Sequence, residues 1–93
     1  KPAFNYKEEK KSLDKRLRLC EKRIAELDQN LTVWQSRLHF LNEAIGVGEA
    51  SDLQKHLLEL GDVQKKIELA EQQWLSFSEE KEAIEREMAS LKD

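Results

Sequence analysis

Hydrophobic residues recur through the first half of the chain at alternating steps of four and three residues. Ten positions follow this alternation: Leu13, Leu17, Cys20, Ile24, Leu27, Leu31, Trp34, Leu38, Leu41 and Ile45. The steps average 3.5 residues, which is the period of a helix that winds around a partner helix. The pattern therefore predicts one long helix with a continuous apolar seam.

The second half of the chain carries a matching seam. Its members are Leu53, His56, Leu60, Val63, Ile67, Ala70, Trp74, Phe77, Lys81, Ile84, Met88 and Leu91. A short glycine-containing connection between two such segments makes them antiparallel neighbours. We therefore expect an all-α fold: two long helices forming an antiparallel coiled-coil hairpin, on the order of 60 Å long.

The helix boundaries follow from capping residues. The only proline, Pro2, marks residues 1–6 as the end of a linker. Asn5 can cap the first helix, predicted at about residues 7–45, because its side-chain oxygen can accept a hydrogen bond from a free backbone N–H. Glu8, three positions on, can complete a capping box.

The connection between the helices is predicted at residues 46–50. Gly46 is expected to end the first helix in the left-handed conformation, which glycine adopts without steric cost. Ser51 and Gln54 form a second capping box. The second helix is therefore predicted at about residues 52–91.

Two registers fit the paired seams. In the first, the numbers of facing residues sum to 101, so that Leu41 meets Leu60 and Leu27 meets Trp74, and large side chains often face smaller ones. A register shorter by three or four residues centres better on the turn. We prefer the register that sums to 101 and keep the shorter one as the alternative.

Composition limits the class of protein. Of the 93 residues, 38% are charged and only one is proline, which suits long helices. No run of about 18 apolar residues offers a membrane span. The single cysteine, Cys20, falls on the seam, so we expect a core residue in a reducing cytoplasmic setting. The start at Lys1 without a methionine suggests a piece of a longer protein.

The chemistry of an enzyme is missing from this sequence. There is no phosphate-binding G-x-x-x-x-G-K-[ST] loop. His39, His56 and Cys20 lack the spacing of metal ligands. The serines have no convergent His–Asp arrangement. We therefore predict no catalytic residue, no cofactor and no metal in this fragment.

A row of basic residues is the main functional signal. Lys11, Lys15, Arg18 and Lys22 step by four, three and four residues, and Lys7 extends the row by one turn. This spacing places them on one helix face, away from the seam. Such a basic stripe predicts salt-sensitive contact with nucleic-acid phosphates. The alternative is a solvated face balanced by acidic residues of the second helix: Glu79, Glu80, Glu82, Glu85 and Glu87.

Apolar residues outside the seams give a second signal. They are Leu19, Val33, Phe40, Leu57, Leu58, Leu69 and Leu75. Some could widen the core, and others could dock against a second copy or another protein. The alternative function is thus a coiled-coil module for protein–protein interaction or dimerisation that binds no nucleic acid.

Three segments resemble the C-terminal extension of ABC-F ATP-binding cassette ATPases of the Uup type. Residues 3–10 hold Tyr6-Lys7-Glu8, where that extension has a Lys-Leu-Ser-Tyr-Lys-Glu-type signature. Residues 24–28 resemble its Ile-x-x-Leu-Glu-like segment. Residues 67–79 resemble its stretch around a tryptophan, which is Trp74 here. The resemblance covers nearly the whole chain.

The resemblance implies a coiled-coil domain that follows the second of two ATPase cassettes. Members of the family are soluble and cytoplasmic, and they act at the ribosome or on nucleic acid. ATP would be bound by the cassettes of the parent chain. The hairpin would be noncatalytic and, in isolation, monomeric. The stripe residues would touch the phosphates of DNA or ribosomal RNA.

Overall fold

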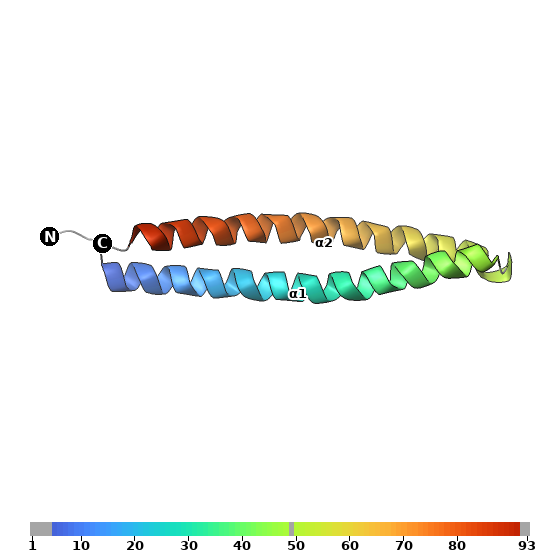
Figure 1. The fold of residues 1–93 in the computed structure, drawn as a ribbon, viewed down its shortest axis with the longest axis horizontal. Coiled ribbons are helices and arrows are strands. Elements are labelled where there is room, and N and C mark those ends of the chain that lie inside the picture. The colour runs from blue at the N-terminus through green and yellow to red at the C-terminus, as the bar shows by residue number, and fades with distance from the viewer. Residues whose placement is uncertain (1–4, 49, 92–93) are drawn as a thin grey trace.

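The computed structural model describes residues 5–48 and 50–91, without the side chains of residues 50 and 51. Helix α1 spans Tyr6–Val47 and helix α2 spans Ala50–Ser90. The two helices run side by side in opposite directions, so the start of α1 and the end of α2 lie at the same end of the rod (Figure 1). The predicted all-α hairpin of two long helices is confirmed.

The start of α1 is fixed by the predicted cap. Asn5 is extended, with φ −123° and ψ 107°. Its side-chain Oδ1 accepts a hydrogen bond from the backbone N–H of Glu8 at 3.2 Å. Glu8 and Glu9 occupy the first turn, where the helix dipole favours negative charge. The chain therefore becomes helical at Tyr6, one residue before the predicted start.

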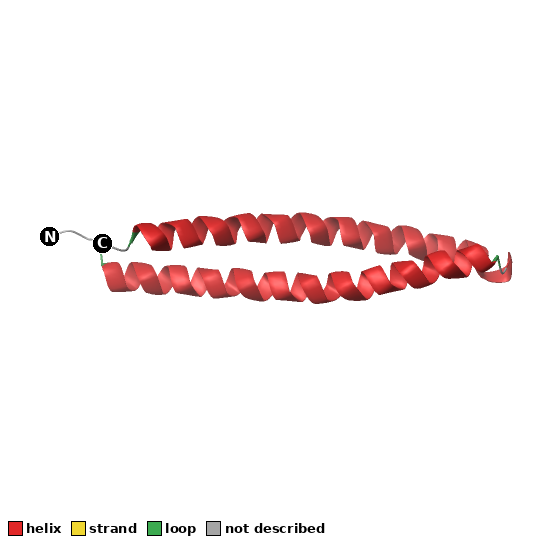
Figure 2. Cartoon of the chain, viewed as in Figure 1, coloured by secondary structure: helices red, strands yellow, loops and turns green. Residues whose placement is uncertain are grey.

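The reversal of the chain lies further along the sequence than predicted. The expectation that Gly46 ends α1 is wrong, because the helix continues through Val47. Gly48 takes the left-handed conformation instead, with φ 79° and ψ 35°. Its N–H donates to the Ile45 carbonyl at 3.1 Å. Since α2 begins at Ala50, the connection is shorter than residues 46–50 (Figure 2). The predicted cap Ser51 lies inside α2, and its side chain is outside the described residues.

The apolar seams face each other along the rod. All ten predicted seam residues of α1 are buried or half-buried. The most buried residues of the hairpin are Leu13, Cys20, Leu41, Val63, Ala70 and Ile84. Around Leu13, Cys20 and Ile84, further seam residues from both helices pack into one cluster. Heptad periodicity thus accounts for the core.

Trp74 is the exception on the α2 seam. It is 38% exposed, whereas Trp34 on α1 is half-buried. The rod measures 75 × 15 × 14 Å and consists of two helices. Each seam is therefore covered by a single partner helix. A side chain as large as an indole extends beyond that cover. Trp74 therefore combines a core position with an exposed edge.

Two ion pairs between the helices bracket the register. The numbers of Glu21 and Lys81, whose charged groups lie 3.7 Å apart, sum to 102. Those of Arg37 and Glu59 sum to 96. The first pair fits the 101 register near the open end. The second fits a shorter register near the turn. Both helices rise about 1.5 Å per residue, so the stagger is constant along the rod and the two pairs bracket it between sums of 96 and 102, because their long side chains reach along the helix axes.

Candidate nucleic-acid interface

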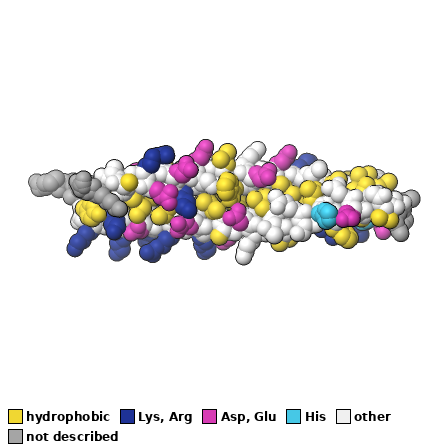
Figure 3. Space-filling model, in the orientation of Figure 1, with side chains coloured by type: hydrophobic (Ala, Val, Ile, Leu, Met, Phe, Trp, Pro, Cys, Tyr) yellow, Lys and Arg dark blue, Asp and Glu magenta, His cyan; other side chains and the backbone are white. Residues whose placement is uncertain are grey.

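The basic stripe lies on the N-terminal half of α1. Lys7, Lys11, Lys15, Arg18 and Lys22 are all exposed. In the space-filling view, Lys and Arg side chains gather along one edge of the rod over this part of α1 (Figure 3). The helix rises 1.5 Å per residue, so the stripe is about 22 Å long. The sequence-based placement of these five side chains away from the seam agrees with the structure.

The stripe cations form no ion pair with the described carboxylates. The ion pairs of lysine and arginine in that part of the chain are Arg23–Glu26, Arg37–Glu59 and Lys81–Glu21, each within 4.0 Å. None includes a stripe residue. Direct pairing with the acidic residues of α2 is therefore not how the stripe charges are balanced, and their ammonium and guanidinium groups are open to an anionic ligand.

Acidic side chains do lie beside the stripe. Lys11 and Lys15 line two shallow depressions of about 230 and 250 Å³. Asp14 shares the first depression and Glu8 the second. These carboxylates reduce the local positive potential without contacting the cations. The surface suits contact with a phosphate backbone better than a deep pocket for one small anion.

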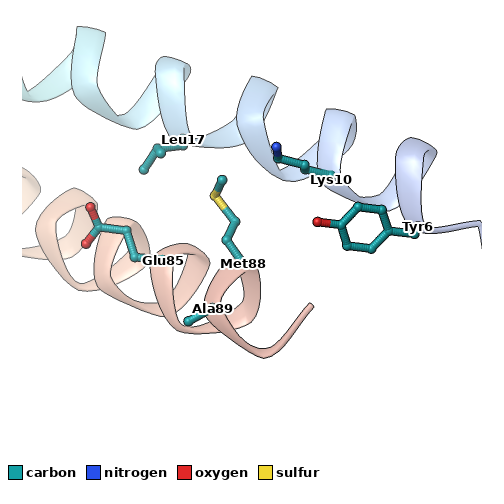
Figure 4. A pocket seen from close by; sticks show the side chains of 6 residues that line it. All are labelled: Tyr6, Lys10, Leu17, Glu85, Met88 and Ala89. Atoms are coloured by element: carbon teal, nitrogen blue, oxygen red, sulfur yellow. The ribbon is translucent and has the colours of Figure 1, made fainter. Parts of the chain in front are cut away.

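A separate pocket opens between the helices at the open end of the rod. It has a volume of about 260 Å³ and is lined by Tyr6, Lys10, Leu17, Glu85, Met88 and Ala89 (Figure 4). The seam is incomplete here because Lys10 occupies the position one heptad before Leu17. Leu17 and Met88 give the pocket an apolar lining, and Lys10 and Glu85 come from opposite helices. None of the five stripe residues lines it.

The lone thiol belongs to the core. Cys20 is 2% exposed and packs in the cluster with Leu13 and Ile84. Burial, and secondarily the Glu80 carboxylate, raises the pKa of this thiol. A raised pKa keeps the sulfur protonated and unreactive near neutrality. The prediction that Cys20 is a core residue of the seam is confirmed.

Neither metal clusters nor membrane spans occur in the described part of the chain. Residues 5–48 and 50–91 contain no group of three or more His, Cys, Asp or Glu side chains placed to hold a metal ion. In the same ranges, neither helix has a stretch apolar enough to cross a bilayer.

The apolar residues outside the seams do not widen the core. All seven are exposed, from 49% for Leu57 to 68% for Leu58. Val47, beside the turn, is 77% exposed and was not among the apolar residues predicted from the sequence. Its spacing of seven residues from Phe40 is the signal that could have found it. The hairpin thus carries two distinct exposed features, one basic and one apolar.

Comparison with protein families, characterised proteins and solved structures finds no match for this chain.

Proposed function

We propose that this hairpin is a noncatalytic accessory arm that contacts the phosphate backbone of nucleic acid, DNA or ribosomal RNA, through its basic stripe. One observation carries the proposal: five exposed cations lie in a row on one face of α1, and none is paired with a described carboxylate. Cations that neutralise phosphates release condensed counterions, which is the main source of nonspecific affinity.

The charge distribution supports this role. Residues 1–23 hold nine Lys or Arg and four Asp or Glu, whereas residues 24–93 hold seven and fifteen. The basic end of the rod attracts a polyanion and the acidic body repels it. Contact with nucleic acid would therefore be confined to the stripe, and the rest of the hairpin would extend away from the nucleic acid as a stiff arm.

The resemblance to ABC-F ATPases suggests the setting for such an arm. In that setting the hairpin follows the second cassette of a cytoplasmic parent protein, and the cassettes bind and hydrolyse ATP. The sequence upstream of Lys1 tests this parentage. A Walker A motif and an ABC signature there are the expected result, and their absence would contradict it.

A salt titration tests the nucleic-acid contact. Binding to a fluorescent DNA duplex and to a ribosomal RNA hairpin is measured by anisotropy at several salt concentrations. Four or five phosphate contacts predict that log K falls with log [salt] with a slope of about −4. Changing Lys11, Lys15, Arg18 and Lys22 together to Gln should abolish most of that slope.

The second helix offers a matched control. Lys55, Lys65, Lys66 and Arg86 are also exposed, so changing them to Gln removes the same charge from a different place. This control should keep the slope and the affinity within a small factor of the original chain. Binding that ignores salt, or that falls equally in both variants, would rule out the stripe as the contact.

A second candidate function is protein–protein interaction or dimerisation through apolar surface. It is favoured by the seven exposed apolar residues outside the seams, because monomeric proteins rarely leave extended apolar surface uncovered. Sedimentation measurements at increasing protein concentration, without nucleic acid, distinguish it from the first candidate.

A further inference from the structure

One line of apolar side chains on α1 has no cover from α2. Leu19, Val33, Phe40 and Val47 follow one another at intervals of 14, 7 and 7 residues. They are between 53% and 77% exposed. Intervals of seven residues keep side chains on one line along a supercoiled helix. The line therefore forms a second, unpartnered edge of α1.

Contacts of Arg37 show which face of the hairpin this line occupies. The Arg37 guanidinium lies 4.9 Å from the centroid of the Phe40 ring and also binds Glu59 of α2. Arg37 directly precedes the seam residue Leu38, and Glu59 directly precedes the seam residue Leu60. These equivalent heptad positions of the two helices therefore meet on one face. We call it the Phe40 face. Leu69 stands two places after the seam residue Ile67, as Phe40 does after Leu38. It therefore lies on the same face, and it is 57% exposed.

The Phe40 face has opposite charges on its two helices. The α1 positions at seven-residue intervals from Arg37 hold three arginines and one acidic residue, so their net charge is +2: Glu9, Arg16, Arg23, Asn30, Arg37 and Ala44. The equivalent positions on α2 carry Glu59, Glu80 and Glu87, with Lys66 between them. A second copy related by a twofold axis along the rod would place each α1 over the other α2. Each basic edge would then face an acidic edge, with both turns at the same end.

The levels along the rod agree with this arrangement. The contact of Glu21 with Lys81 puts Arg23 at about the level of Glu80. Asn30 and Gln73 line one pocket, so they lie at about the same height along the rod. Val33 and Leu69 each lie about one helical turn closer to the hairpin connection, so they are also at about the same height. A twofold axis along the rod preserves these levels between copies. Arg23 would therefore meet Glu80, and Val33 would meet Leu69, of the second molecule.

We propose that two copies of this chain associate through the Phe40 face into an antiparallel four-helix bundle. Helices of 42 and 41 residues make the face about 60 Å long, and the rod is 15 Å across. Two copies would therefore bury roughly 1,800 Å², within the usual range for stable complexes. The interface deepens the second candidate function and rests on it. It departs from the monomer expected from the sequence. The stripe, at positions on the other side of α1, stays accessible.

Sedimentation equilibrium of the intact chain tests the association, with a matched pair of variants on α2. Leu69→Glu changes the Phe40 face, whereas Leu75→Glu changes a residue of nearly equal exposure, 57% against 55%, on another face. We expect a dimer at about 100 μM protein. The first variant should weaken it at least about tenfold and the second should leave it unchanged. Circular dichroism checks that both variants keep their helices.

A charge exchange tests the orientation. Arg23→Glu and Glu80→Arg each place like charges opposite each other in a homodimer, but a mixture of the two variants restores both pairs. We expect each variant alone to dimerise more weakly, and the mixture to form a heterodimer of near-original affinity. A chain that stays monomeric at about 1 mM would overturn the interface together with dimerisation. If Leu69→Glu left the dimer affinity unchanged, this interface would be overturned but dimerisation would not. The same holds if the mixture of Arg23→Glu and Glu80→Arg dimerised no more tightly than either variant alone.

Discussion

The Arg37 guanidinium on α1 holds the Glu59 carboxylate on α2 by two hydrogen bonds, Nε to Oε2 at 2.5 Å and Nη2 to Oε1 at 2.8 Å. The pair joins helices that are 22 residues apart in sequence at this point. A planar guanidinium meeting a carboxylate through two bonds has a more restricted geometry than a lysine pair. Both side chains remain partly exposed, so the pair orients the helices more than it stabilises them.

Removing this pair should affect thermal stability in a pH-dependent way. The hydrogen bonds from Arg37 lower the pKa of Glu59, so the pair stabilises the fold above the ordinary glutamate pKa of about 4.3. That stabilisation is lost as the pH falls through the lower pKa of the folded state. Glu59→Gln should lower Tm by about 1–3 °C at pH 7 and by less at pH 3. Thermal melts followed by circular dichroism check this, and an equal decrease at both pH values would contradict it.

The two glycines near the turn should respond in opposite directions to alanine. Gly48 has a positive φ, which costs an L-residue about 1–2 kcal/mol, so Gly48→Ala should destabilise the hairpin. Gly46 is helical with open space where a Cβ would lie, so Gly46→Ala should stabilise it by about 0.5–1 kcal/mol. Urea unfolding measures both changes. The opposite order would place the left-handed stop at Gly46.

The seam should be far more sensitive to truncation than the outer surface. Leu41 is fully buried, so Leu41→Ala should reduce the free energy of unfolding by about 2–5 kcal/mol. Leu58, on the other helix, is 68% exposed, and Leu58→Ala should change it by no more than about 0.5 kcal/mol. The same urea measurements compare the two. Similar losses in both variants would mean that the seam is not the core.

The Cys20 thiol should react slowly while the hairpin is folded. Burial shields the sulfur and raises its pKa, so at a given pH less reactive thiolate is present than in the unfolded chain. At pH 8 a chromogenic disulfide reagent should modify the native chain at least about tenfold more slowly than the chain in guanidinium. Equal rates under both conditions would show that the cluster around Leu13 and Ile84 leaves the sulfur open.

The sequence alone determined the helices, their seams and the exposure of the stripe. These properties depend on spacing within one helix: a step of three or four residues decides whether a side chain such as Cys20 or Lys15 faces the partner or the solvent. The N-cap at Asn5 is equally local, since it needs only a side-chain oxygen three residues before a free N–H.

Only the tertiary structure decided how the two helices meet. Gly46 and Gly48 are both able to take the left-handed conformation, and the structure places it at Gly48. The register, bracketed by the pairs of Glu21 with Lys81 and Arg37 with Glu59, likewise depends on side chains far apart in sequence. The exposure of Trp74 has the same origin, because heptad spacing assigns a residue to the seam but does not say whether one partner helix is wide enough to cover it.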